Sequence, residues 1–148
     1  MKKTTKWAKI LLGSALALCF SLTLCACGEE GPYEFWQPDD QIKSIEIVNV
    51  YGAINEPLQY EVLVTIKNHE SFLEKFYKIS FGTYIIGDPT TAYGVCIRVQ
   101  YKNGDCEYIN DHAQNRFFSE MPNNRYYGRR YCDQEEFFAL LTYFGYVG

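Results

Sequence analysis

The sequence predicts an α+β fold: an antiparallel sheet of four to five strands with two helices packed on one face, in the order β-β-α-β-β-(β)-α. Three observations support this prediction. Several segments are rich in β-branched residues or alternate apolar with polar positions, as half-buried strands do. Two segments repeat phenylalanine at helical spacing behind an N-capping residue. The length of 148 residues, 47% of them apolar, suits one globular domain.

The first half of the domain predicts two strands and a helix. Residues 42–50 are rich in isoleucine and valine and predict a strand. Residues 60–66 predict a second strand, because Tyr60, Val62, Val64 and Ile66 alternate with other residues and would share one face. Asn68 is a favourable N-cap, and apolar residues at helical spacing behind it predict a helix over residues 69–79.

A hairpin follows, with strands expected at residues 92–101 and 105–111. The dipeptide Asn103-Gly104 predicts a two-residue turn, since both positions of such a turn require a positive φ. This turn would pair Tyr101 with Cys106 and would place Cys106 on the core face. Glu107 would then lie on the opposite, mostly solvent-exposed face.

The last third predicts a loop, a short strand and a helix. Residues 113–132 contain few apolar positions in a regular pattern, and we expect a strand only near residues 125–131. Asp133, with Glu136 three residues later, matches the capping box that begins a helix. Gly145 marks the expected end of this helix.

The N-terminal segment has the features of an export signal. Four lysines precede an apolar stretch over residues 10–24, which is shorter than the roughly 20 residues that a spanning helix needs. The ending Leu24-Cys25-Ala26-Cys27 resembles the lipobox of bacterial lipoproteins. The resemblance implies that Cys27 receives a diacylglyceryl group and that a peptidase cuts after Ala26. Cys19 and Cys25 do not fit this pattern, because each follows a leucine.

This resemblance divides the chain into a signal peptide at residues 1–26, a lipidated Cys27 with an acidic tether at residues 27–41, and a single α+β domain at residues 42–148. The segment 28–40 is acidic and contains two prolines, and as an extended tether it would reach about 40 Å. Its aromatic residues would either rest in the membrane interface or pack back on the domain; they are Tyr33, Phe35 and Trp36. The expected location is the cell membrane, facing outside the cytoplasm.

The charge distribution bears on the partner. Beyond residue 26 the chain has 10 basic and 18 acidic residues, a net charge of −8 that argues against nucleic acid. Residues 116–131 instead carry a local charge of +3, with tyrosines between the arginines. Tyrosine and arginine are enriched at binding hot spots. The predicted partner-binding residues are Tyr126, Tyr127, Arg129, Arg130 and Tyr131. The partner would be a protein, a glycan or an anionic wall polymer; alternatively, the arginines neutralise carboxylates beside an edge strand.

Three cysteines remain in the domain. The expected hairpin register places Cys96 and Cys106 on opposite faces and roughly 17 Å apart along the strands, which is too far for a disulfide. A bond between Cys106 and Cys132 stays open as an alternative to free, buried thiols. No C-x-x-C pair is present, which disfavours a zinc site.

Catalytic patterns are scarce, because the sequence contains none of the common hydrolase, protease or phosphate-binding motifs. One alternative is a thiol- or histidine-dependent hydrolase in which His112 acts with Cys96, Cys132 or an acid. The hairpin acids Asp105, Glu107 and Asp111 are expected to be surface charges rather than calcium ligands. We predict no metal or cofactor. The sequence therefore favours a membrane-anchored, extracytoplasmic lipoprotein that serves as a non-catalytic binding or accessory module.

Overall fold

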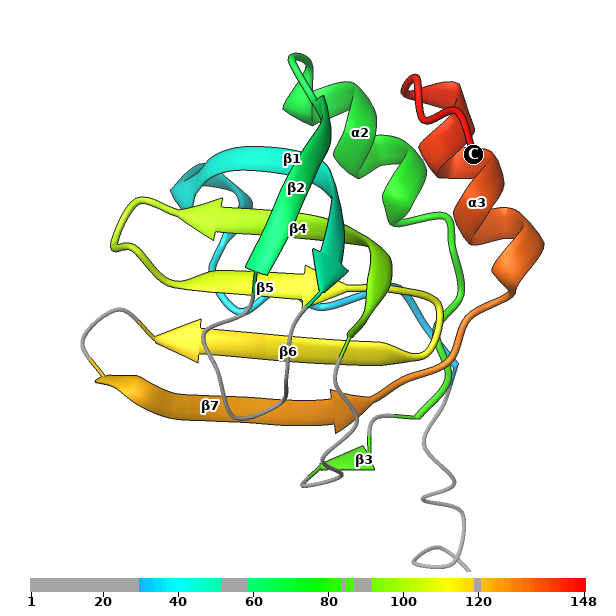
Figure 1. Ribbon diagram of the computed structural model, residues 1–148. Coiled ribbons are helices and arrows are strands. Elements are labelled where there is room, and N and C mark those ends of the chain that lie inside the picture. Colours follow the sequence, from blue (N-terminus) through cyan, green and yellow to red (C-terminus); the bar gives the residue numbers. More distant parts are fainter. Residues whose placement is uncertain (1–29, 52–58, 84, 87–91, 119–120) are drawn as a thin grey trace, which may run out of the picture.

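The computed structural model describes residues 30–51, 59–83, 85–86, 92–118 and 121–148, and for residues 86, 118 and 121–127 it describes the backbone alone. Its strands form one antiparallel sheet in the order β2-β1-β4-β5-β6-β7-β3 (Figure 1). The strands are β1 (Ile42–Tyr51), β2 (Gln59–Thr65), β3 (Ile85–Ile86), β4 (Gly94–Tyr101), β5 (Cys106–Ile109), β6 (Ala113–Phe118) and β7 (Met121–Arg129). The helices are α2 (His69–Phe76) and α3 (Gln134–Tyr143), and a short 3-10 helix, η1 (Asp39–Gln41), precedes β1.

The predicted α+β class is confirmed, and both helices pack on the same face of the sheet (Figure 1). On this face, which we call the helix face, Ile47 of β1 pairs with Ile97 of β4, and Ile97 pairs with Ile109 of β5. All three isoleucines are completely buried in the main core cluster together with Phe72 of α2 and Phe137 of α3. Each such side chain stabilises the fold by roughly 1.5–3 kcal/mol through burial.

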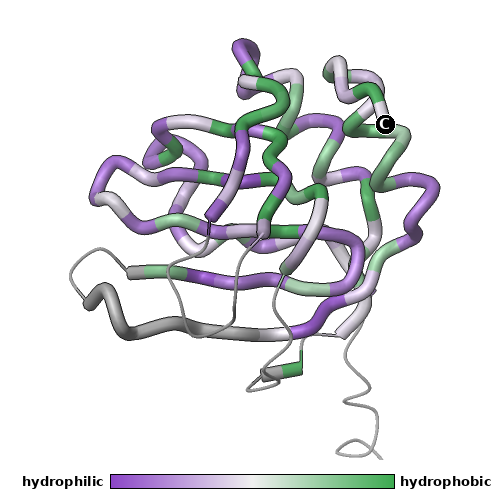
Figure 2. The backbone as a smooth tube through the Cα atoms, viewed as in Figure 1, coloured by the Kyte–Doolittle hydropathy of each residue, from purple (hydrophilic) through white to green (hydrophobic). Residues whose placement is uncertain are grey.

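The sheet is larger than predicted, because residues 113–118 and 121–129 form two paired strands instead of a loop and one short strand. The middle of β6 is strongly hydrophilic, as Figure 2 shows, and this hid the strand in the sequence. Gln114 and Asn115 are nevertheless buried. The Asn115 side chain accepts a hydrogen bond of 2.7 Å from the backbone N–H of Ala92.

The turn between β4 and β5 differs from the expected two-residue turn and changes the register of the hairpin. Only Gly104 has a positive φ (+94°) there, and Tyr101 N–H donates to Asp105 O at 2.9 Å, so the connection has three residues. Such a turn, with glycine in the third position, is the next commonest hairpin connection. Cys106 therefore pairs with Gln100 rather than Tyr101. A slip of one residue exchanges the two faces of a strand, and it brings Glu107 onto the helix face.

Strand β2 also departs from simple alternation. Val62 pairs with Val48, whereas Val64 pairs with Ile47, and the register shifts between Ile47 and Val48. The extra residue at this bulge is Leu63, and the expectation that Val62 and Val64 share one face is wrong. A bulge twists an edge strand and protects it from pairing with other chains.

The helix boundaries follow the predicted capping residues. Asn68 Oδ1 accepts a hydrogen bond from Ser71 N–H at 3.0 Å, and Asp133 Oδ1 accepts one from Glu136 N–H at 3.0 Å. Helix α2 ends at Phe76, three residues before its predicted end, and Gly145 follows α3 with a φ of +100°. Within the described ranges, neither helix has the length and apolar character required to cross a bilayer.

The segment before β1 is part of the folded domain from Gly31 onward. Gly31 forms an antiparallel bridge with Phe81, which bridges in turn to Cys132. Tyr33 is 2% exposed, and its ring packs edge-on against Phe35, Phe76 and Phe81. Residues 31–38, which we call the strap, are therefore not the extended tether that the composition predicted. Residues 1–29, including the lipobox, lie outside the described residues.

Candidate functional site

Glu107 is the centre of a buried polar cluster that holds the strap on the sheet. Its side chain is 1% exposed. Its Oε2 accepts a hydrogen bond from the Tyr33 hydroxyl at 2.6 Å, and its Oε1 accepts one from the Tyr101 hydroxyl at 2.6 Å. The backbone N–H of Trp36 also donates to Oε1. Burial and the neighbouring Glu107 raise the pKa of both tyrosines, so the phenols stay protonated as donors.

Arg116, opposite Glu107 on β6, completes this cluster. Its Nε lies 3.5 Å from Glu107 Oε2, and its Nη2 donates to the carbonyl of Glu34 at 3.2 Å. The guanidinium carbon also lies 5.0 Å from the centre of the Trp36 ring, in a cation–π contact. The cluster thus fixes the strap at Tyr33, Glu34 and Trp36. A buried charge that lost its partner would be strongly destabilising, so these contacts define a rigid geometry.

The strap lines an open hollow of about 450 Å³ beside α2. The lining residues come from the strap, η1 and the end of α2: Tyr33, Glu34, Phe35, Trp36, Gln37, Pro38, Asp39 and Tyr77. Aromatic rings form much of the lining, and Trp36 remains 42% exposed. The Tyr77 hydroxyl donates to Asp39 Oδ1 at 2.5 Å and links the helix to η1. Apolar and aromatic walls with a few convergent polar groups are typical of ligand pockets.

Of the predicted partner-binding residues, Arg130 is half-buried and binds the backbone of other segments. Arg130 donates to the carbonyls of Gly82, Gly31, Pro32 and Phe81, at 2.6 to 3.4 Å, and so joins the strap to the sheet. Arg130 therefore has a structural role, which the positive charge of residues 116–131 did not predict.

Of the other residues of that set, Tyr131 is exposed and Arg129 is half-buried. The Tyr131 side chain is 52% exposed, and Arg129 Nη1 donates to its hydroxyl at 3.3 Å. Tyr126 and Tyr127 belong to the backbone of β7, but their side chains lie outside the described residues. Arg130 thus has a structural role, and Tyr131 is the exposed residue of the set whose side chain is described.

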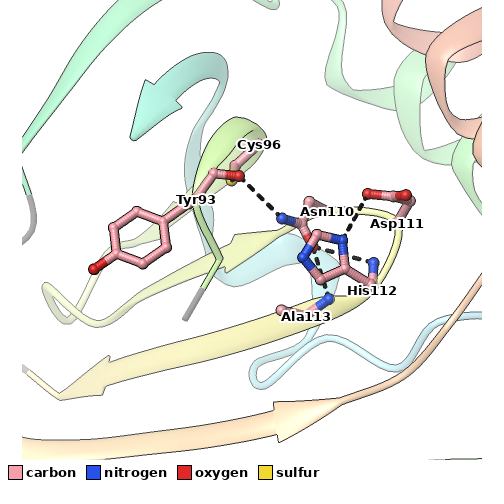
Figure 3. A network of polar contacts seen from close by, with 6 residues as sticks. All are labelled: Tyr93, Cys96, Asn110, Asp111, His112 and Ala113. Atoms are coloured by element: carbon pink, nitrogen blue, oxygen red, sulfur yellow. Dashed lines mark hydrogen bonds and ion pairs between the residues drawn. The ribbon is translucent and has the colours of Figure 1, made fainter. Parts of the chain in front are cut away.

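His112 of the hydrolase alternative lies in the turn between β5 and β6, which Asn110 organises, and Cys96 lies on strand β4 (Figure 3). Asn110 Oδ1 accepts hydrogen bonds from the backbone N–H groups of His112 at 3.1 Å and Ala113 at 2.7 Å. His112 Nδ1 lies 3.0 Å from Asp111 Oδ1, and the Cys96 thiol points to the carbonyl of Tyr93 at 3.9 Å. The hydrogen bonds of Asn110 form a tight turn between β5 and β6.

All three cysteines of the domain are free. Cys96 and Cys106 lie on the same sheet face, not on opposite faces, because of the register slip. Burial raises the pKa of Cys96 to about 12, that of Cys106 to about 11 and that of Cys132 to about 12. A nucleophilic cysteine needs a lowered pKa, so the arrangement opposes thiolate chemistry near neutral pH.

The Glu107 cluster and the hollow were not predicted from the sequence, because Glu107 was expected on the solvent face and residues 28–40 were expected to form an extended tether. The alternative that the aromatic residues of this segment pack back on the domain is confirmed for Tyr33, which is buried against Phe76 and Phe81. The aromatic content of an otherwise acidic segment was the signal that pointed toward the site. Comparisons with protein-family models, with curated proteins and with solved structures find no match to this chain.

Proposed function

We propose that this protein is a lipid-anchored, non-catalytic binding module on the outer face of the cytoplasmic membrane, and that it binds a neutral glycan in the strap hollow. The sequence Leu24-Cys25-Ala26-Cys27 supports the anchor, with Gly28 following Cys27 as expected for retention at that membrane. The diacylglyceryl group on Cys27 would hold the folded part at the surface.

The single observation that carries the binding role is the hollow itself. It includes the exposed aromatic surface of Trp36, whose backbone N–H donates to Glu107 and whose ring contacts Arg116. A preformed site pays less ordering entropy when its ligand binds. Trp36 is held at its backbone by Glu107 and at its ring by Arg116, and it is therefore preorganised for a stacked ligand.

The chemistry of the lining favours an uncharged ligand with hydroxyl groups. The apolar face of a sugar ring stacks on aromatic side chains, and the carboxylates of Glu34 and Asp39 and the amide of Gln37 offer acceptors for hydroxyl groups. The same carboxylates repel an anionic wall polymer. A neutral glycan therefore fits better than the anionic polymer that the arginine-rich segment suggested.

The catalytic alternative receives no support from the site geometry. His112 contacts Asp111, the Cys96 thiol points to a backbone carbonyl, and the pKa of each of the three thiols is raised. A thiol enzyme would place a base against a sulfur of lowered pKa.

The test of this function measures glycan binding by the processed, lipidated chain in vesicles. We would titrate it with a soluble N-acetylglucosamine oligomer and, separately, with polyglycerol phosphate. Trp36→Ala should weaken binding of the neutral oligomer by at least about tenfold, since aromatic anchors dominate binding energies. The matched control is Tyr143→Ala, because Tyr143 is an exposed aromatic residue (66%) on α3.

Mass spectrometry of the N-terminal peptide checks the anchor in the same material. The glycan proposal would be contradicted if the wild-type protein does not bind the neutral oligomer. It would also be contradicted if the Trp36→Ala variant binds the oligomer with the affinity of the wild type. Tighter binding of polyglycerol phosphate would instead favour the anionic partner. An unmodified Cys27 would remove the anchor from the proposal.

A further inference from the structure

The point at which the chain enters the fold lies beside an exposed, amphipathic surface. Gly31 is held by its bridge to Phe81 and by the hydrogen bond that its carbonyl accepts from Arg130. Gly82 N–H donates to the carbonyl of Tyr131 at 2.8 Å, so Tyr131 belongs to the same group of contacts. Ile85 on β3 pairs with Arg129 on β7. We call Ile85, Arg129 and Tyr131 the entry surface.

The proposed lipid attachment is close to this surface along the chain. Gly31 follows Cys27 by four residues. A fully extended chain spans at most about 3.6 Å per residue, so Gly31 can lie no more than about 14 Å from Cys27. The tether predicted from composition would have reached about 40 Å and left the domain clear of the lipid. Because the strap is folded, the domain has no such freedom.

The side chains of the entry surface suit the interface between lipid and water. Tyr131 is 52% exposed and Ile85 is 49% exposed, although both are large and apolar. Arg129 donates to the Tyr131 hydroxyl, which places a guanidinium beside the ring. Tyrosine is enriched at membrane interfaces, and arginine can extend its charge to the headgroups while its stem covers apolar surface.

We propose that the entry surface rests on the headgroup region of the phospholipid bilayer and gives the domain a fixed orientation on the membrane. This inference rests on the proposed lipid anchor at Cys27. It assigns Arg129 and Tyr131, two of the predicted partner-binding residues, to lipid rather than to a soluble partner. Three acidic residues belong to the segments that pack here: Glu30, Asp111 and Asp133. Their negative charges offset the attraction of Arg129 to anionic headgroups. We therefore expect the contact with the bilayer to depend on Tyr131 and Ile85 and to form on uncharged lipid as well.

The test uses tryptophan fluorescence in the processed, lipidated protein. The chain has two tryptophans, Trp7 in the expected leader and Trp36 in the strap, so Trp36→Phe leaves a processed chain without tryptophan. Into this background we would place Tyr131→Trp or Ile85→Trp as probes of the entry surface. The matched control is Tyr143→Trp, which is also an exposed tyrosine and lies at the C-terminal end of α3, far from β3 (Figure 1).

Each variant would be reconstituted into phosphatidylcholine vesicles with or without bromine atoms on the acyl chains near the headgroups. We expect quenching of at least about twofold for the Tyr131→Trp and Ile85→Trp probes and little quenching of the Tyr143→Trp probe, as for interfacial and solvent-exposed rings. Thermal melting of each variant, followed by circular dichroism, verifies that it is folded. The two entry probes come from different segments, since Ile85 lies on β3 and Tyr131 follows β7.

Mass spectrometry of the same samples separates the two proposals. If Cys27 carries the lipid but neither entry probe is quenched, the docking inference is wrong and the anchor stands. Equal quenching of the entry probes and the control probe would also overturn it, because the domain would then have no fixed orientation. If Cys27 is unmodified, the anchor fails and the docking inference fails with it.

Discussion

Glu107 shows how one carboxylate can unite segments that are distant in the sequence. It lies 74 residues from Tyr33 and 71 from Trp36, and it accepts a hydrogen bond from each. Its position within a strand predicted only a surface acid. A local pattern cannot reveal such partners, because their contribution depends on tertiary placement.

Replacing Glu107 with glutamine tests this cluster. Oε1 accepts from Trp36 N–H and the Tyr101 hydroxyl, and Oε2 accepts from the Tyr33 hydroxyl and faces Arg116. Either orientation of the amide turns its NH2 group toward a donor. We expect Glu107→Gln to lower the free energy of unfolding by about 2–4 kcal/mol in urea denaturation.

The matched control for this change is Glu61→Gln on the exposed edge strand β2. It makes the same chemical change at the surface and should alter stability by no more than about 0.5 kcal/mol. Similar losses in the two variants would show that Glu107 is not the centre of the cluster.

The hairpin turn marks the limit of prediction from single residues. Asn103-Gly104 suits a two-residue turn in which both residues have positive φ. In the structure only Gly104 adopts it, and Asn103 instead binds Asp105 through its side chain, with Asn103 Oδ1 accepting from Asp105 N–H at 3.0 Å. The two turns differ by one residue, yet that difference decides whether Glu107 or Cys106 lies on the helix face.

At the level of elements, strands and helices with strong local signals were predicted well. The N-caps Asn68 and Asp133 and the strands β1 and β4 follow from capping chemistry and apolar pattern. Strand β6 was missed because its buried positions are polar. Their hydrogen bonds come from other segments, such as the Ala92 N–H that Asn115 binds, and no alternation of hydropathy marks them.

Each helix should depend on its capping residue. Both Asn68→Ala and Asp133→Ala remove a side-chain oxygen that accepts from the first turn. We expect each to cost about 1 kcal/mol of unfolding free energy, measured by chemical denaturation. Asp133→Asn retains the acceptor and should cost little. An Asp133→Asn variant as unstable as Asp133→Ala would show that the oxygen is not the source of the effect.

For the whole molecule, the buried thiols and phenols predict a loss of stability in alkali. Burial raises the pKa of Cys96 and Cys132 to about 12 and that of Cys106 to about 11, and it also raises the pKa of Tyr33, Tyr101 and Tyr108. Above about pH 9, the unfolded chain releases protons that the folded chain keeps. Stability is therefore fully present below that pH and is lost as the pH rises through the folded values.

Urea denaturation at a series of pH values measures this effect. The midpoint should stay level from pH 7 to about 8.5 and should then fall steadily toward pH 11. Cys96→Ala removes one of the responsible groups and should make the decline shallower. A midpoint that remains constant through pH 10.5 would contradict the raised pKa values as a group.

The position of the strap also constrains how the domain assembles during synthesis. The ribosome makes Tyr33 long before Glu107, which accepts its hydrogen bond and follows 74 residues later. Gly31 likewise precedes its bridge partner Phe81 by 50 residues. The ring contacts of Tyr33 with Phe76 and Phe81 involve earlier residues, but its buried hydroxyl has no acceptor until β5 exists. A chain that stops short of β5 would leave the Tyr33 side chain in contact with water, and chaperones and proteases recognise such exposed apolar surface. Completion of the strands is therefore the step that protects the N-terminal segment.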